Sequence, residues 1–158
     1  MKPILCLDFD GVIHSYSSGW KGASVIPDPP VPGALEFIVQ ALEQFEVHIL
    51  SSRSHQWGGK SAMKHYLRSE YEALGQAEAM LEPWWGDCVN EVGASSMEPW
   101  YVANRDAAAS IVRQIKWPWF KPPATVTIDD RAITFTGQWP ALSDLRAFKP
   151  WNKKGQPQ

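Results

Sequence analysis

Two pairs of aspartates and a serine stand directly after apolar segments, and they are the residues in this sequence best suited to chemistry. Asp8 and Asp10 follow the apolar run 4–7, and Asp129 and Asp130 follow the run 124–128. Residues two apart on an extended chain point to the same face, so we expect Asp8 and Asp10 to lie side by side. Clustered carboxylates are costly unless a cation or a bound group compensates their charge. Their pattern therefore predicts a ligand site.

The elements that must position these residues alternate between strands and helices. Apolar runs predict buried strands at 4–7, 46–50 and 124–128, with a short strand at 133–135. Helical periodicity is present at 33–45, 61–74, 101–116 and 140–148, and Gly75 is expected to end the second of these helices. This alternation predicts an α/β fold with a central, mostly parallel sheet and helices on both faces.

A parallel sheet brings the carboxyl ends of its strands to one edge, where open α/β sheets bind ligands. The first strand delivers Asp8 and Asp10 to this edge, the second delivers Ser51, and the third delivers Asp129 and Asp130. Three polar strand ends, two of them acidic pairs, are poorly explained as solvated turns. We therefore expect these five residues to converge.

The connections are less regular than the core. Residues 12–26 predict a β-hairpin that projects beyond the first aspartates, with His14 at its surface. Residues 76–100 have no clean period and are interpreted as a small lid or a long loop. Residues 1–150 form one predicted domain, and the polar C-terminal tail, 151–158, is expected to fray.

The composition limits the classes of function. The chain has 158 residues and a net charge of −2, so no basic field indicates binding to nucleic acid or to a membrane surface. No apolar run could cross a bilayer, and no signal peptide precedes the first strand. Two separated cysteines form no zinc cluster or evident disulfide framework, which favours the cytoplasm.

The chemistry favoured by several carboxylates at one point is phosphoryl transfer with Mg²⁺. This ion takes oxygen ligands and keeps several waters, so one or two carboxylates and a phosphate can hold it. A carboxylate can also act as the nucleophile and form an aspartyl-phosphate. A second carboxylate can protonate the leaving oxygen and then activate water. A hydroxyl, a lysine and the metal would neutralise the phosphoryl oxygens.

Three segments resemble the motifs of the haloacid dehalogenase superfamily of phosphohydrolases. Residues 8–12, Asp-Phe-Asp-Gly-Val, resemble the first motif, residues 49–51 the second, and residues 127–130 the fourth. The resemblance spans about residues 4–135 and implies a three-layer, Rossmann-like fold with a flap after the first strand. Too few residues separate the first motif from the following helix for a large first cap, so a capless or small-cap member is implied.

The resemblance assigns roles to the acidic residues. Asp8 would be the nucleophile, and Asp10 would be the general acid and base. The Asp8 carboxylate, the Asp10 backbone carbonyl and Asp129 would hold Mg²⁺. Asp130 would be a direct or water-mediated ligand, or a partner of the lysine. An aspartate at the second acidic position is typical of phosphatases and phosphotransferases, and it argues against dehalogenation.

The resemblance also assigns the groups that contact the phosphoryl oxygens. Ser51 would donate a hydrogen bond to them. Lys116 and Lys121 are both candidates for the lysine of the third motif. Lys121 is favoured because it stands just before the strand that delivers Asp129, whereas Lys116 suits the end of a helix, where cations are stabilised.

Residues after the second motif bear on the substrate. Ser52 and Arg53 are predicted to bind it, and together with the Asp-Asp-Arg at 129–131 they resemble the phosphatase half of polynucleotide kinase-phosphatases. Arg53 and Arg131 could each bind phosphate or pair with Asp87 or another carboxylate. The expected partner is a phosphorylated small molecule or the end of a nucleotide or nucleic acid, with no membrane involved. The oligomeric state is not predicted.

Two alternatives stay open. The same residues would serve a phosphotransferase that passes the group to an acceptor other than water. A chain with nine tryptophans could also be a binding module with little catalysis, since aromatic side chains stack on single strands. The low basic content and the complete set of charged catalytic positions favour an enzyme.

Overall fold

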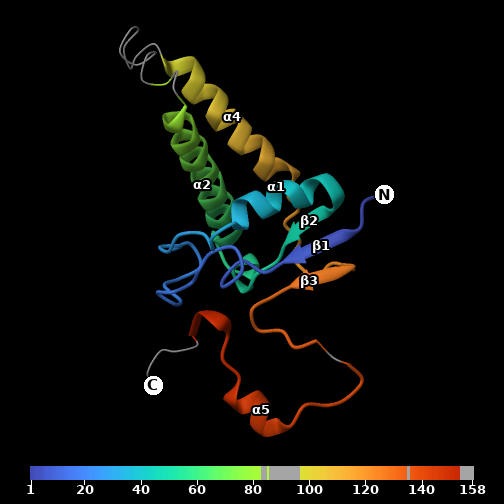
Figure 1. Ribbon diagram of the computed structural model, residues 1–158. Coiled ribbons are helices and arrows are strands. Elements are labelled where there is room, and N and C mark those ends of the chain that lie inside the picture. Colours follow the sequence, from blue (N-terminus) through green and yellow to red (C-terminus); the bar gives the residue numbers. More distant parts are fainter. Residues whose placement is uncertain (83–84, 86–96, 135, 154–158) are drawn as a thin grey trace.

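The computed structural model describes residues 1–82, 85, 97–134 and 136–153, and it shows a mixed α/β fold (Figure 1). The strands are β1 (Ile4–Leu7), β2 (Glu46–Ile49) and β3 (Val126–Ile128). The α-helices are α1 (Ala34–Gln44), α2 (Gly59–Leu81), α4 (Glu98–Gln114) and α5 (Leu142–Ala147). Two short 3₁₀ helices are η1 (Ser52–His55) and η3 (Trp151–Lys153).

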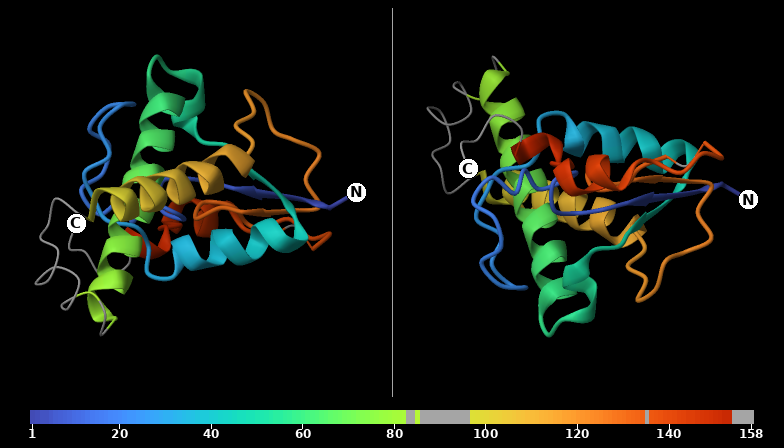
Figure 2. Two further views of the ribbon diagram at one scale, coloured as in Figure 1. Left: turned by 90° about the horizontal axis from the view of Figure 1, so that it is seen from above. Right: turned by 90° about the horizontal axis from the view of Figure 1, so that it is seen from below.

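The sheet is parallel, with the strand order β2-β1-β3. Cys6 of β1 lies opposite His48 on one side and Thr127 on the other. In both views of Figure 2, α1 lies to one side of the sheet and α4 to the other. The predicted parallel α/β arrangement is therefore confirmed at this level, and all three strands bring their carboxyl ends to one edge.

The apolar side chains between the sheet and the helices form one core. From β1 and β2 it takes Leu5, Leu7, Val47 and Ile49, and from α1, α2 and α4 it takes Leu35, Ile38, Ala41, Met63, Tyr66, Leu67, Tyr71, Ala108 and Val112. The α1 residues recur every three residues, which places them on one face of that helix. Burying this face holds α1 against the sheet.

Helix α2 is longer than predicted because Gly75 does not end it. A Cβ at Gly75 would clash with the side-chain oxygen of Asn104 on α4, so glycine here allows the two helices to approach closely. Asn104 also donates from Nδ2 to the Glu72 carbonyl oxygen at 2.9 Å. The glycine thus serves helix packing rather than a C-cap, and α2 continues to Leu81.

The predicted third strand is present but shorter, and the prediction that it is buried is wrong. Every residue of β3 is exposed, and Val126 and Ile128 keep 45% and 39% of their surface. The reason is visible in Figure 1, where the chain after β3 runs away from the sheet instead of covering it. Residues 133 and 134 form no strand, and residue 135 lies outside the described residues. Helix α5 is shorter than the predicted 140–148, and none of its residues is buried.

Residues 12–26 contain turns and isolated bridges rather than the two strands of the expected hairpin. Tyr16 adopts a φ of 55°. The backbone N–H and the hydroxyl of Ser18 both donate to the Asp28 carboxylate, the former at 2.9 Å. These bonds fasten residue 18 to Asp28, ten residues further along the chain, in place of the strand pairing expected within the hairpin.

The question of a lid falls largely outside the described residues. Residues 76–81 continue α2 and residues 98–100 begin α4, while 83–84 and 86–96 are not described. Within the described chain, no helix combines the length and the apolar character needed to span a membrane.

The beginning of the polar tail is held against the loop that follows β1. Trp151 Nε1 donates to the Gly11 carbonyl oxygen at 2.7 Å. Asn152 Nδ2 and Lys153 Nζ donate to the carbonyl oxygens of Ser15 and Ser17 at 3.1 and 3.2 Å. We call residues 151–153 the C-terminal clamp. These hydrogen bonds contrast with the fraying that was expected for residues 151–153.

Candidate functional site

Three of the four aspartates of the two acidic pairs meet at the carboxyl edge of the sheet, and Asp10 is not among them. One carboxylate oxygen from each of Asp8, Asp129 and Asp130 lies within 4.8 Å of the others. Adjacent parallel strands deliver them, and the Asp8 N–H donates to the Ile128 carbonyl oxygen at 2.9 Å. The second strand end is tied to the first because Leu50 N–H donates to the Leu7 carbonyl oxygen at 3.0 Å. We call Asp8, Asp129 and Asp130 the acidic cluster.

Asp130 is the buried member of the acidic cluster. Its side chain has no exposed surface, and neither carboxylate oxygen has a hydrogen-bond partner. Arg131 approaches one oxygen, with Nε at 3.7 Å. Burial raises the pKa of Asp130 above its ordinary value. Unpartnered buried oxygens are costly, and a hard cation would satisfy them, so the donor set fits Mg²⁺.

Gly11 allows this arrangement. Its φ of 86° is in the left-handed region, and a Cβ at this position would clash with the Asp130 carboxylate. Glycine is therefore needed after Asp10 for two physical reasons: the backbone conformation and the close approach of Asp130.

Asp8 and Asp129 differ in their surroundings. Burial, with smaller contributions from the charges of Asp129, Asp10 and Asp130, raises the pKa of Asp8 to about 7. The Phe9 N–H, which donates to Asp8 Oδ1 at 2.7 Å, offsets part of this rise. Asp129 is exposed and accepts the Arg131 N–H at 2.8 Å. A bound cation would relieve the repulsion among these carboxylates.

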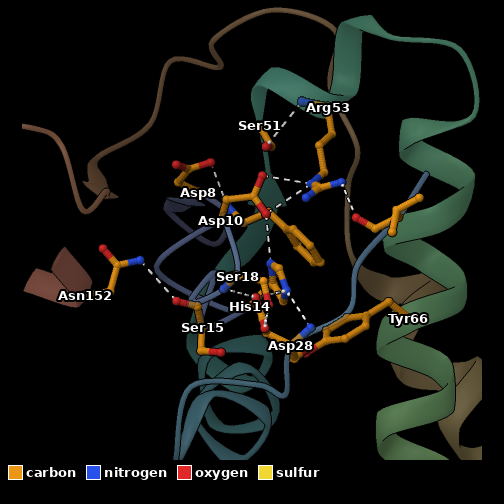
Figure 3. A network of polar contacts seen from close by, with 12 residues as sticks. Asp8, Asp10, His14, Ser15, Ser18, Asp28, Ser51, Arg53, Tyr66 and Asn152 are labelled. Carbon is orange, nitrogen blue, oxygen red and sulfur yellow. Dashed lines mark hydrogen bonds and ion pairs between the residues drawn. The ribbon is translucent and has the colours of Figure 1, made fainter. Parts of the chain in front are cut away.

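Asp10 is not part of the acidic cluster, and its carboxylate points into a buried network with Arg53 and His14 (Figure 3). Arg53 Nε donates to both carboxylate oxygens of Asp10, at 2.8 and 3.1 Å. His14 Nδ1 lies 2.9 Å from Asp10 Oδ1. Burial alone would raise the pKa of Asp10, but the hydrogen bonds from His14 and Arg53, together with the charge of Arg53, lower it below its ordinary value.

His14 is fully buried, contrary to its expected place on the surface. Its ring stacks on Phe9 with centroids 5.8 Å apart and meets the edge of Tyr66 at 5.7 Å. The Asp28 backbone N–H donates to Nε2 at 3.2 Å, so Nε2 acts as an acceptor and the imidazole proton is on Nδ1, toward Asp10. The only sign of this pairing in the sequence was that His14 follows Asp10 by four residues. A tight turn brings the two side chains together.

Arg53 was predicted to contact substrate or to pair with a carboxylate. Its guanidinium is fully buried and pairs with Asp10. The alternative partner Asp87 lies outside the described residues. Ser52 is exposed at the start of η1. A contact of Ser52 or Arg53 with substrate stays a prediction.

Ser51 is buried and caps η1. Its Oγ accepts the Arg53 N–H at 3.4 Å, and its own N–H donates to Ser54 Oγ at 3.2 Å. Because the hydroxyl accepts this bond, its hydrogen is left to donate to a ligand. The capping turn thus fixes Ser51 at the edge where Asp8 stands (Figure 3).

The two candidate lysines differ in their surroundings. The backbone of Lys116 pairs with β2, where it donates to the Val47 carbonyl oxygen and accepts the Ile49 N–H, both at 2.9 Å. The charge of Lys116 helps to lower the pKa of Glu46, after the hydrogen bond from His48. Lys121 is exposed, and its charge opposes the rise that burial causes in the pKa of Cys6. A role of Lys121 near Asp8 stays a prediction, and no ion pair of Lys121 occurs among the described residues.

Comparison with known proteins identified no relative of this chain: no family model matches it, and neither the curated proteins nor the solved structures gave a match.

Proposed function

We propose that this protein is a Mg²⁺-dependent phosphomonoester hydrolase that works through an aspartyl-phosphate on Asp8. The observation that carries the proposal is the acidic cluster itself, in which the buried oxygens of Asp130 have no hydrogen-bond partner among the described residues. The motif resemblance supports the same conclusion, and it extends the proposal to a three-layer, Rossmann-like member of the haloacid dehalogenase superfamily.

The acidic cluster would hold the ion through carboxylate oxygens of Asp8, Asp129 and Asp130. When bound, Mg²⁺ would offset the negative charge of these side chains and of the phosphoryl group. The resemblance adds the Asp10 backbone carbonyl as a ligand. Arg53 and His14 hold the Asp10 side chain by hydrogen bonds. This side chain is not needed as a metal ligand and would carry out the proton transfers.

The reaction has two steps. In the first, an Asp8 oxygen attacks phosphorus, the bond from phosphorus to the ester oxygen breaks, and Asp10 gives a proton to the leaving alcohol. In the second, Asp10 takes a proton from water, whose oxygen attacks phosphorus and frees Asp8 and inorganic phosphate. The hydrogen bonds that lower the pKa of Asp10 favour its carboxylate form, which the second step requires, and they oppose the protonated form that the first step requires.

Ser51 and Lys121 would contact the transferring group. The Ser51 hydroxyl would donate to one phosphoryl oxygen, and the Lys121 ammonium would offset charge that grows in the transition state. The substrate class is a phosphorylated small molecule or the end of a nucleotide or nucleic acid, with Ser52 as an exposed contact.

The test is phosphate release from a panel of phosphomonoesters, nucleotides and 3′-phosphorylated oligonucleotides, with Mg²⁺ and with a chelator. We expect turnover that needs Mg²⁺ and that Asp8→Asn abolishes, because the amide is not a nucleophile. Asp106→Asn, which changes an exposed aspartate of α4, is the matched control. Beryllium fluoride should form its adduct on Asp8. Normal turnover by Asp8→Asn would refute the mechanism.

A further inference from the structure

The guanidinium of Arg53 joins three parts of the chain that are distant in sequence. Its Nε donates to Asp10, 43 residues away. Its Nη1 donates to the carbonyl oxygens of Gly22, Ala23 and Val25 at 2.7, 2.9 and 3.1 Å. The arginine itself belongs to η1, after β2. One side chain therefore contacts the loop of Asp10, the connection after it and the turn that carries Ser51.

Trp20 completes the enclosure of this arginine. Its ring lies over the guanidinium, with the central carbon 4.7 Å from the ring centroid. Trp20 keeps 44% of its own surface, so it covers the arginine from the solvent side. We call residues 20–25 the flap segment. The flap segment lies against Arg53, which is fully buried.

A buried charge is stable only when its partners are in place. If the flap segment moved away, Nη1 would lose three acceptors and water would reach the guanidinium. The ion pair with Asp10 would then weaken, because water screens it. Conversely, loss of the Asp10 charge would leave Arg53 unpaired and would weaken its hold on the flap segment.

We propose that Arg53 is a positioning residue that couples closure of the flap segment to the orientation of the Asp10 carboxylate. Its effect on catalysis rests on the proposed function, whereas the coupling between the two segments does not. In this arrangement, proton transfer by Asp10 is efficient only while the flap segment is closed.

This role differs measurably from direct binding of substrate. A positioning residue acts on the catalytic step, so its loss lowers kcat and leaves KM nearly unchanged. A ligand of the substrate phosphate would mainly raise KM. Nη2 is buried and has no protein partner, so it is the only donor of Arg53 left for such a contact in the described chain.

The first experiment needs no turnover. Amide hydrogen exchange is measured across 20–26 in wild type and in Asp10→Asn, which touches none of the flap carbonyls. The Val25 N–H, bonded to the Gly22 carbonyl oxygen at 3.2 Å, is the reporter. We expect its exchange to accelerate by roughly tenfold or more, because local opening becomes easier. Exchange equal to wild type would refute the coupling.

The second experiment uses Trp20→Leu, which keeps every hydrogen bond of Arg53 and uncovers one face of the guanidinium. We expect the Val25 amide to exchange faster and kcat to fall by about tenfold, with KM within about twofold. Trp57→Leu, at a fully exposed tryptophan, is the matched control and should change neither. Leu67→Ala, in the core, controls for lost stability and should leave kcat per folded molecule unchanged.

The outcomes separate the two proposals. A raised KM with unchanged kcat in Trp20→Leu would overturn the positioning role. Unaltered Val25 exchange in both variants would also overturn it. Absence of phosphatase turnover in wild type, combined with faster exchange in the variants, would refute the proposed function and leave the coupling established.

Discussion

Asp10 is held by side chains four and 43 residues further along the chain. His14 presents its Nδ1 proton to one oxygen, and Arg53 reaches both. Asp130, in contrast, has no hydrogen-bond donor for either oxygen. Asp10 therefore has its hydrogen-bond donors in place, which suits it to the proposed proton transfer. Asp130 lacks such donors, which suits it to the proposed binding of a cation.

At the same scale, the two lysines should differ sharply. Lys121→Ala should lower kcat by about two to three orders of magnitude, because a charge that stabilises the transition state is lost. Lys116→Ala should change it little, since the charge of Lys116 acts on Glu46, which begins β2. Steady-state kinetics on one phosphomonoester would decide. The reverse ranking would move the phosphate contact to Lys116.

Without a bound metal, ionisation of Asp8 should make the stability of the protein depend on pH. Its pKa rises from 3.8 to about 7 on folding, so the folded state binds the proton more tightly than the unfolded chain. Stability without metal should therefore fall as pH rises from about 4 to about 7. Urea unfolding with chelator at several pH values would measure this.

Asp8→Asn should flatten that dependence, because no ionisable group is left at the position. Saturating Mg²⁺ should also reduce it, since the ion stabilises the carboxylate form. The free energy of unfolding of the metal-free wild type and of Asp8→Asn would be compared between pH 4 and pH 7. The same change with pH in both proteins would contradict this account of Asp8.

At the scale of the elements, the turn after β1 limits which substitutions the site can accept. Gly11→Ala should lose turnover and much of its stabilisation by Mg²⁺, because the methyl group displaces Asp130. The positive φ adds about 1–3 kcal/mol of strain. Gly33→Ala is the matched control, since its φ of 81° carries the same strain and no atom lies within 4 Å of the added carbon.

Thermal unfolding with and without Mg²⁺ would compare the two variants. Both should lose stability without metal, whereas only Gly11→Ala should lose the response to Mg²⁺. An equal response in both would show that Gly11 serves the backbone alone.

The elements that the sequence predicted well are those whose pattern is local. Short apolar runs that precede Asp8, Ser51 and Asp129 indicate parallel strands with a shared carboxyl edge, and the structure brings Asp8, Asp129 and Asp130 together there. The helix pattern located α1 within a residue at either end. Periodicity and strand ends are properties of consecutive residues, so a sequence can reveal them.

The elements predicted poorly depend on distant partners. Gly75 reads as a helix end until Asn104 of α4 is placed beside it. The apolar residues of β3 indicate burial, but whether they are covered depends on the path of the chain after Arg131. The pairing of Asp10 with Arg53 likewise spans two strands, and no local pattern announces it.

For the molecule as a whole, the acidic edge links metal binding to stability. The proposed Mg²⁺ would bind the assembled cluster and not the unfolded chain, so it should raise the melting temperature in a saturable way. Asp129→Asn should weaken this response, because one anionic oxygen is lost. The same change should raise the stability of the metal-free protein by relieving repulsion.

Differential scanning calorimetry across a Mg²⁺ titration, with chelator as the zero point, would test both statements. The exposed change Asp106→Asn should behave as wild type. No shift with Mg²⁺ in wild type, together with hydrolysis in chelator, would exclude a magnesium site at this edge.

The C-terminal clamp sets an order in which the site can be completed during refolding. Its three donors follow the carbonyl groups they hold by 136 to 140 positions. The acidic cluster needs none of these contacts, so its carboxylates can assemble first. Fastening the loop 11–17 requires residues 151–153, and closing so long a segment is intrinsically slow. On refolding from denaturant the chain should therefore pass through a form that has its acidic cluster but whose neighbouring loop is still unfastened.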